Sequence, residues 1–131
     1  GLAFLRAAAS AELWAVDYES KASEMGVTVE KAMQAAGLFN AYCSRCHTGC
    51  YSSGQPFEQG AGSGAWGPSL RANRAVIQFP SLEDHVKFVI SGSEDSKRFG
   101  VNGLGSGRMP AFGLILSETQ IELIALYERT L

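Results

Sequence analysis

Hydrophobic residues recur at intervals of three and four along several stretches of the chain, which is the spacing of an amphipathic helix. The clearest stretch runs from Val29 to about Tyr42, and Thr28 before it has a side chain suited to a helix N-cap. Its apolar face consists of Ala32, Ala35, Ala36, Phe39 and Cys43. Because alanine is small, this face is a shallow groove that another helix can approach closely.

Two further helices have clear start signals. Ser81 precedes a predicted helix from Leu82 to about Ser91, which Gly92 ends. Ser117, with Gln120 three residues later, begins a predicted last helix. The expected buried faces are Leu82, Val86, Val89 and Ile90 in the first, and Ile121, Leu123, Ile124, Ala125 and Tyr127 in the second, which we expect to pack on the alanine groove.

Residues 4–25 also favour a helix, because alanine is frequent there and Gly26 follows as a stop signal. We therefore predict an N-terminal helical extension, residues 1–27, and one domain, residues 28–131. The extension is either a helix lying on the domain, or a stalk from a membrane anchor or a contact with a partner subunit, and we prefer the second interpretation. The chain has no apolar run of about 18 residues and no signal-peptide pattern at its opening. We interpret it either as a mature form or as a fragment whose export signal or anchor lies upstream.

Glycines cluster in two predicted loops, residues 48–67 and 92–113. A short helical turn through Arg71 and Arg74 is expected after the first loop. Twenty residues without regular structure are long for a compact domain, unless the chain wraps around a ligand. Glycine also lets the backbone lie close to a flat molecule. The formal charge of −2 and the pI of about 5.7 provide no basic field for nucleic acid.

The stretch Cys43-Ser44-Arg45-Cys46-His47 is C-x-x-C-H, the attachment signature of a c-type haem. Two thiols at this spacing can add across the two vinyl groups on one porphyrin edge and form two thioethers. The next residue, His47, then lies under the iron as an axial ligand. The motif therefore predicts one covalently bound haem c with its iron.

Other uses of these cysteines fit the sequence less well. A structural zinc site usually takes two separated pairs of ligands, but Cys43, Cys46, His47 and Cys50 lie within eight residues and no second pair exists. An iron–sulfur cluster needs four thiolates, whereas the chain has three cysteines. A redox-active C-x-x-C would expect a βαβ context, which is absent. Cys50 is left over, and we interpret it as a bystander.

A sixth iron ligand is best supplied by Met109. A thioether is soft and neutral and favours Fe(II). Met109 lies in the second glycine-rich loop before Pro110, which restricts the backbone, whereas Met25 ends a surface helix and Met33 is too close to Cys43 on a rigid helix. His85 is interpreted as a structural residue.

Together these residues resemble a class I cytochrome c of the bacterial monohaem type over residues 28–131. The marks of the resemblance are Phe39 four residues before Cys43, the haem motif, Gly67-Pro68-Ser69-Leu70, residues 108–113 around Met109, and residues 117–131 with Tyr127. It implies an all-α fold wrapped around one haem, with His47 and Met109 as axial ligands and the Pro68 carbonyl bonded to the other nitrogen of His47. The long first loop, Cys50 and the N-terminal helix depart from the family pattern.

The predicted function is one-electron transfer, as a carrier or as the haem domain of a respiratory or other redox complex, and not enzymatic catalysis. Redox proteins, including a membrane oxidoreductase complex, are the expected partners, and the expected location is extracytoplasmic. Arg45 and Arg108 are expected to rim the exposed haem edge, and candidate donors to the haem propionates are Tyr51, Trp66, Arg71 and Arg74. A catalytic or sensory haem with a displaceable sixth ligand is the alternative.

Overall fold

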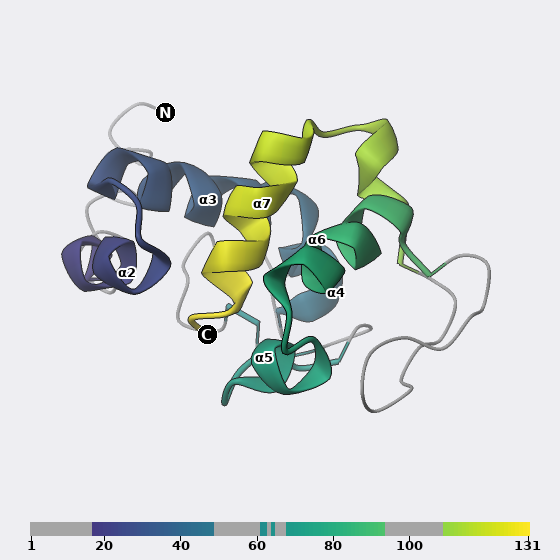
Figure 1. Ribbon diagram of the computed structural model, residues 1–131, viewed down its shortest axis with the longest axis horizontal. Coiled ribbons are helices and arrows are strands. Elements are labelled where there is room, and N and C mark those ends of the chain that lie inside the picture. Colours follow the sequence, from purple (N-terminus) through teal and green to yellow (C-terminus); the bar gives the residue numbers. More distant parts are fainter. Residues whose placement is uncertain (1–16, 49–60, 63, 65–67, 94–108) are drawn as a thin grey trace, which may run out of the picture.

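The computed structural model describes residues 17–48, 61–62, 64, 68–93 and 109–131. These residues form helices and connecting turns, and they contain no β-strand. The all-α prediction is therefore confirmed. In chain order the helices are α2 (Tyr18–Met25), α3 (Val29–Tyr42), α4 (Ser44–His47), α5 (Arg74–Gln78), α6 (Leu82–Ser91), the 3₁₀ turn η3 (Phe112–Leu114) and α7 (Glu118–Glu128) (Figure 1).

Helices α3 and α7 cross at the centre of the fold (Figure 1). The predicted alanine groove of α3 is buried, with Ala32 and Ala35 fully covered. Phe39 follows on the same face and packs on Tyr127 of α7, with ring centroids 5.3 Å apart and planes inclined by 51°. Fully burying one side chain of this size contributes about 1.5–3 kcal/mol, so this crossing is a main source of stability.

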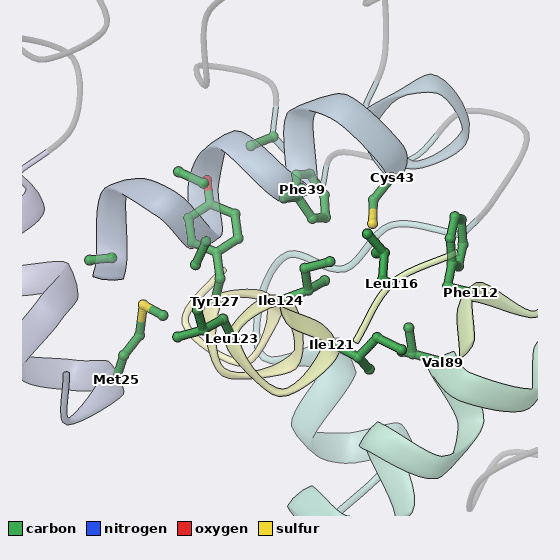
Figure 2. Packing of buried hydrophobic residues seen from close by; sticks show 14 of the residues in the cluster. Met25, Phe39, Cys43, Val89, Phe112, Leu116, Ile121, Leu123, Ile124 and Tyr127 are labelled. Atoms are coloured by element: carbon green, nitrogen blue, oxygen red, sulfur yellow. The ribbon is translucent and has the colours of Figure 1, made fainter. Parts of the chain in front are cut away.

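The second contact of α7 is with α6. Figure 2 shows Ile121 of α7 meeting Val89 of α6, and both side chains are buried. The other apolar residues predicted for the buried face of α6, namely Leu82, Val86 and Ile90, are only partly buried. His85 instead is buried on this helix, so the inner face of α6 is more polar than its hydrophobic pattern indicated.

The predicted helix starts are confirmed. Thr28 caps α3 by accepting a hydrogen bond from the Lys31 amide, and Ser81 caps α6. At Ser117 both halves of a capping box are present, since its hydroxyl accepts from the Gln120 amide and the Gln120 side chain accepts from the Ser117 amide. These side chains satisfy amide groups that have no partner inside the helix.

The predicted continuous helix over residues 4–25 is wrong at Asp17. This residue has an extended backbone, with φ −82° and ψ 90°, and its carboxylate accepts hydrogen bonds from the amide and hydroxyl of Ser20. A short acidic side chain competes for backbone amides in this way and starts a new helix. The part of the prediction before Asp17 lies outside the described residues.

Helix α2 packs against α3, and its Tyr18, Ala22 and Met25 belong to the main hydrophobic core. These contacts favour a helix that lies on the domain over a free stalk for residues 18–25. The domain division near residue 27 stays a prediction. Among the described residues, no helix has both the length and the apolar character needed to cross a bilayer.

The short helical turn was predicted to run through Arg71 and Arg74, but the helix begins only at Arg74. Ala72 and Asn73 both have φ of 59°, which is a left-handed conformation, so Arg71 lies in a turn and α5 begins at Arg74. This turn leads the chain from the segment beside His47 to α5 and α6.

Candidate haem site

The C-x-x-C-H motif consists of Cys43, which is the C-cap of α3, and the four residues of α4. The Cys43 amide still donates to the Phe39 carbonyl of α3 at 2.8 Å, and the His47 amide donates to the Cys43 carbonyl at 2.9 Å. Ser44 tightens this turn, because its hydroxyl donates to the side chain of Asn40 at 3.0 Å. The motif is thus one compact turn, which brings its three chemically important side chains into a fixed order.

The two cysteines are unequal. Cys43 is buried and Figure 2 shows its sulfur directed toward Leu116, whereas Cys46 is exposed, and neither forms a disulfide. Burial raises the pKa of the Cys43 thiol well above its ordinary value, and the charge of Glu128 raises it further. Zinc binds the thiolate and not the thiol, so this environment disfavours a zinc site. In the part of the chain that the structure describes, no three histidine, cysteine or acidic residues are grouped for a metal ion.

The imidazole of His47 has a defined orientation. Its Nδ1 lies 2.8 Å from the backbone carbonyl of Pro68, twenty-one residues away in the chain. Because a carbonyl oxygen only accepts hydrogen bonds, Nδ1 carries a proton, and in the neutral imidazole this leaves the lone pair on Nε2. This is the contact that the resemblance implied, and it prepares Nε2 for a metal.

Backbone bonds hold this segment against the motif. The Gly64 amide donates to the His47 carbonyl at 2.7 Å, and the Gly62 amide donates to the Thr48 hydroxyl at 3.2 Å. Gly64 has φ of 92°, and a Cβ atom there would stand 2.8 Å from the amide nitrogen of Ser69. Glycine is therefore required where the segment passes His47, because its backbone lies against that of Ser69.

Two arginines predicted as propionate donors contact this same segment. Arg71 Nε donates to the Ala61 carbonyl at 2.7 Å, and Arg74 Nη1 donates to the Ser69 hydroxyl at 2.9 Å. Both arginines thus stabilise the segment that supports His47, and their role toward propionates stays a prediction. The other two candidates, Tyr51 and Trp66, lie outside the described residues, as do Cys50, Arg108 and the side chain of Arg45.

Met109 is fixed through Ser93, a residue that the sequence analysis missed. The Met109 amide donates to the Ser93 hydroxyl at 2.9 Å, and the Ser93 amide donates to the Met109 carbonyl at 2.8 Å. Ser93 is buried, and the Met109 side chain is partly buried against the core. No local pattern marks Ser93, because both bonds join positions sixteen residues apart.

His85 has a structural partner, as expected from the sequence. Its Nε2 lies 2.7 Å from Oε2 of Glu128 on α7. The sequence analysis assigned no role to Glu128. The structure shows that it is buried, next to Tyr127 in the chain.

These features fit a covalently attached haem. One sulfur faces the core, the other is exposed, and His47 presents a metal-binding nitrogen beside them. In comparisons with known proteins, the model of the family "Cytochrome C oxidase, cbb3-type, subunit III" matches residues 30–127, which is more than half of the chain. Searches of curated proteins and of solved structures found no match. The chain therefore belongs to this family of cytochrome c domains, which bind a covalent c-type haem with its iron and serve in electron transfer.

Proposed function

We propose that the chain transfers single electrons through one haem that Cys43 and Cys46 attach by thioethers and that His47 and Met109 ligate. The observation that carries this proposal is the 2.8 Å contact between His47 Nδ1 and the Pro68 carbonyl. A bound haem iron supplies a one-electron couple between Fe(III) and Fe(II). The residues of the chain keep the two axial side chains in place in both oxidation states.

Each axial residue is held through the backbone as well as through its side chain. The His47 carbonyl accepts from the Gly64 amide, while Met109 is bonded to Ser93 in both directions. A ligand that stays in place makes electron transfer require little rearrangement. The neutral thioether of Met109 also favours Fe(II) and raises the reduction potential.

We expect electrons to enter and leave at the edge that carries the two cysteines, because Cys46 is exposed. Next to it, Tyr42 packs edge-on against Phe112, with ring centroids 6.4 Å apart. Tyr42, Leu114 and Ile115 are also exposed, by 40%, 90% and 61%. The contact between Tyr42 and Phe112 places the end of α3 beside η3, and we propose that a redox partner docks on this side of the domain.

The family assignment supports work as a haem subunit or domain of a redox complex, on the extracytoplasmic side of a membrane. The same chemistry also suits a carrier that moves between complexes. In both cases the chain supplies electron transfer and no catalytic step. The expected partners are proteins with their own one-electron centres.

The ligand assignment is tested by Met109→Ala in the haem-loaded protein. The ferric wild type should show the near-infrared band of Met-ligated haem, and the variant should lose it and bind carbon monoxide when reduced. Met33→Ala is the matched control, because Met33 is exposed on α3, and its spectrum should equal that of the wild type. An unchanged spectrum in Met109→Ala refutes the assignment. Carbon monoxide binding by the reduced wild type would instead favour the catalytic or sensory alternative.

A further inference from the structure

A buried ionisable pair joins α6 and α7. His85 and Glu128 are exposed by only 3% and 4% in their side chains, and their Nε2 and Oε2 atoms lie 2.7 Å apart. The ring of Phe79 stacks on the His85 imidazole, with centroids 5.5 Å apart and planes 12° apart. The pair therefore shares one hydrogen bond in a largely apolar environment.

Stability alone does not account for this pair. Removing two ionisable groups from water is costly, and replacing such a pair by apolar residues of similar volume is often neutral or stabilising. Moreover, Nδ1 of His85 is buried and has no hydrogen-bond partner within the described part of the chain. An unpaired buried nitrogen adds a further cost, so the arrangement points to a function.

The pair can hold one proton more or less without losing its hydrogen bond. In the state with one proton fewer, Glu128 is ionised, neutral His85 donates from Nε2, and the net charge is −1. One added proton makes the pair neutral. That proton either makes His85 cationic, or resides on Glu128 while the imidazole proton moves to Nδ1. The unpaired Nδ1 is the atom that carries a proton in both forms.

The charged groups on the neighbouring elements are exposed or already engaged. On α6, Lys87 pairs with Glu83 at 3.1 Å in solvent, and Asp84 is exposed. On α7, the Arg129 guanidinium donates to the Phe79 and Pro80 carbonyls at 2.7 and 3.1 Å. Besides α6 and α7 themselves, the elements that contact them are α2, α3 and η3. Their other ionisable groups are Tyr127, Glu118 and Glu122 on α7, Tyr18, Glu19, Lys21 and Glu24 on α2, and Glu30, Lys31, Tyr42 and Cys43 on or next to α3. The turn η3 has none.

Among these groups, Cys43 links the pair to the haem site. Glu128 directly follows Tyr127, whose ring packs on Phe39 of α3 with centroids 5.3 Å apart. Cys43 lies one helical turn beyond Phe39, and all four side chains are buried. Charges interact strongly through a protein interior because little water screens them. We therefore expect a charge on Glu128 to change the electrostatic potential at the haem edge that Cys43 attaches.

We propose that the His85–Glu128 pair is a proton-binding site coupled to the oxidation state of the haem. In the haem-loaded protein, the pair would take up one proton from solvent when a redox partner supplies one electron, and would change from −1 to neutral, so that the added charge is compensated. Reoxidation returns the electron to the next partner and the proton to solvent. This proposal rests on the proposed electron-transfer function and extends it to proton-coupled transfer.

The test measures the reduction potential of the haem-loaded protein from about pH 5 to 8, the range in which histidine changes charge. The wild-type potential should fall as pH rises. The total fall is about 59 mV if the reduced form binds the proton ten times more tightly than the oxidised form, and about 59 mV more for each further factor of ten. The double variant His85→Leu/Glu128→Leu should have a constant potential near the acidic limit of the wild type. Glu83→Gln, which removes an exposed carboxylate of α6, should follow the wild type.

Two results would overturn the proposal. One is a wild-type potential that changes by less than about 18 mV, which corresponds to a twofold difference in proton binding. The other is a double variant that keeps the wild-type dependence, since the titrating group would then lie elsewhere. The near-infrared band of the wild type tests the Met109 assignment separately, so failure of one proposal is distinguishable from failure of the other.

A second measurement needs no variant and decides the question if the double variant does not fold. The chain has two histidines, so magnetic resonance of isotope-labelled histidine can follow the His85 ring directly. A proton on either partner changes the ring nitrogens, because it protonates Nδ1. The midpoint of this change should move to higher pH when the protein is reduced, and equal midpoints in both oxidation states would refute the coupling.

Discussion

The substitution Gly92→Ala should loosen Met109 from a distance. Gly92 ends α6 with φ 66° and ψ −166°, a backbone conformation that is essentially restricted to glycine. An added Cβ atom would lie 2.5 Å from the Met109 carbonyl oxygen and 2.5 Å from the carbonyl carbon of Pro110. These atoms belong to the backbone, so no side-chain rotation relieves the overlap, and the Met109–Pro110 segment must move.

The expected cost has two parts. The unfavourable backbone conformation costs about 1–3 kcal/mol. Movement of Met109 also weakens its two hydrogen bonds with Ser93, each contributing about 0.5–1.5 kcal/mol. If both hydrogen bonds are lost, the free energy of unfolding should fall by roughly 2–6 kcal/mol, which is a large part of the about 5–15 kcal/mol that stabilises a typical domain.

Two other glycines separate these contributions. At Gly26, φ is 71° and nothing lies within 4 Å of the added Cβ, so Gly26→Ala should show the conformational cost alone, about 1–2 kcal/mol. Gly37 lies inside α3, also with nothing within 4 Å, and Gly37→Ala should stabilise by up to about 1 kcal/mol. Denaturant unfolding of the three variants gives the free energies, and the near-infrared band of the ferric protein reports the Met109 ligand.

The explanation fails if Gly92→Ala is destabilised no more than Gly26→Ala and keeps the full near-infrared band. That outcome would mean that the Met109–Pro110 segment adapts to the added methyl group without losing its place. Loss of the band in Gly26→Ala would be equally damaging, because that substitution leaves Met109 untouched.

Three further predictions concern other parts of the fold. Phe39→Ala should lower the free energy of unfolding by about 3–5 kcal/mol in denaturant titrations, because the fully buried ring packs on Tyr127; a loss below 1 kcal/mol would contradict the α3–α7 core. Ser117→Ala should cost about 1 kcal/mol by the same measurement, because it removes the N-cap of α7, and an unchanged stability would argue against the capping box. Hydrogen bonds from Ser20 lower the pKa of Asp17 below its ordinary value, so Asp17 stabilises the fold above its unfolded-state pKa and loses this effect as pH falls through its folded-state pKa. Asp17→Asn should therefore lose less stability on acidification than the wild type, and identical acid profiles would refute this.

Several features of the protein follow from residues close together in the chain. The three N-caps and the buried face of α3 were predictable, because capping and helical periodicity act over three or four residues. The haem motif is local for the same reason, since its five residues carry both sulfurs and the imidazole. The helix start at Asp17 is also local but was missed, because the alanine-rich sequence suggested one helix through this position, whereas the Asp17 carboxylate caps a helix that begins at Tyr18.

The contacts that hold the axial residues are of another kind. The family resemblance suggested that Pro68 orients His47, but nothing in the sequence showed that Ser93 fixes Met109 or that Gly92 must pass close to it. Each contact joins residues on separate elements, so it depends on how α6 and the segment before α5 pack against the core.

The His85–Glu128 pair shows this difference most clearly. Taken alone, a histidine on the inner face of one helix and a glutamate near the end of another are ordinary residues. Forty-three positions separate them, and only the packing of α6 on α7 brings Nε2 and Oε2 to 2.7 Å and removes both from water. Short-range backbone preferences determined the helices and the attachment motif, whereas burial and long-range pairing, which exist only after the helices pack, decided the environment of the axial residues and of this pair.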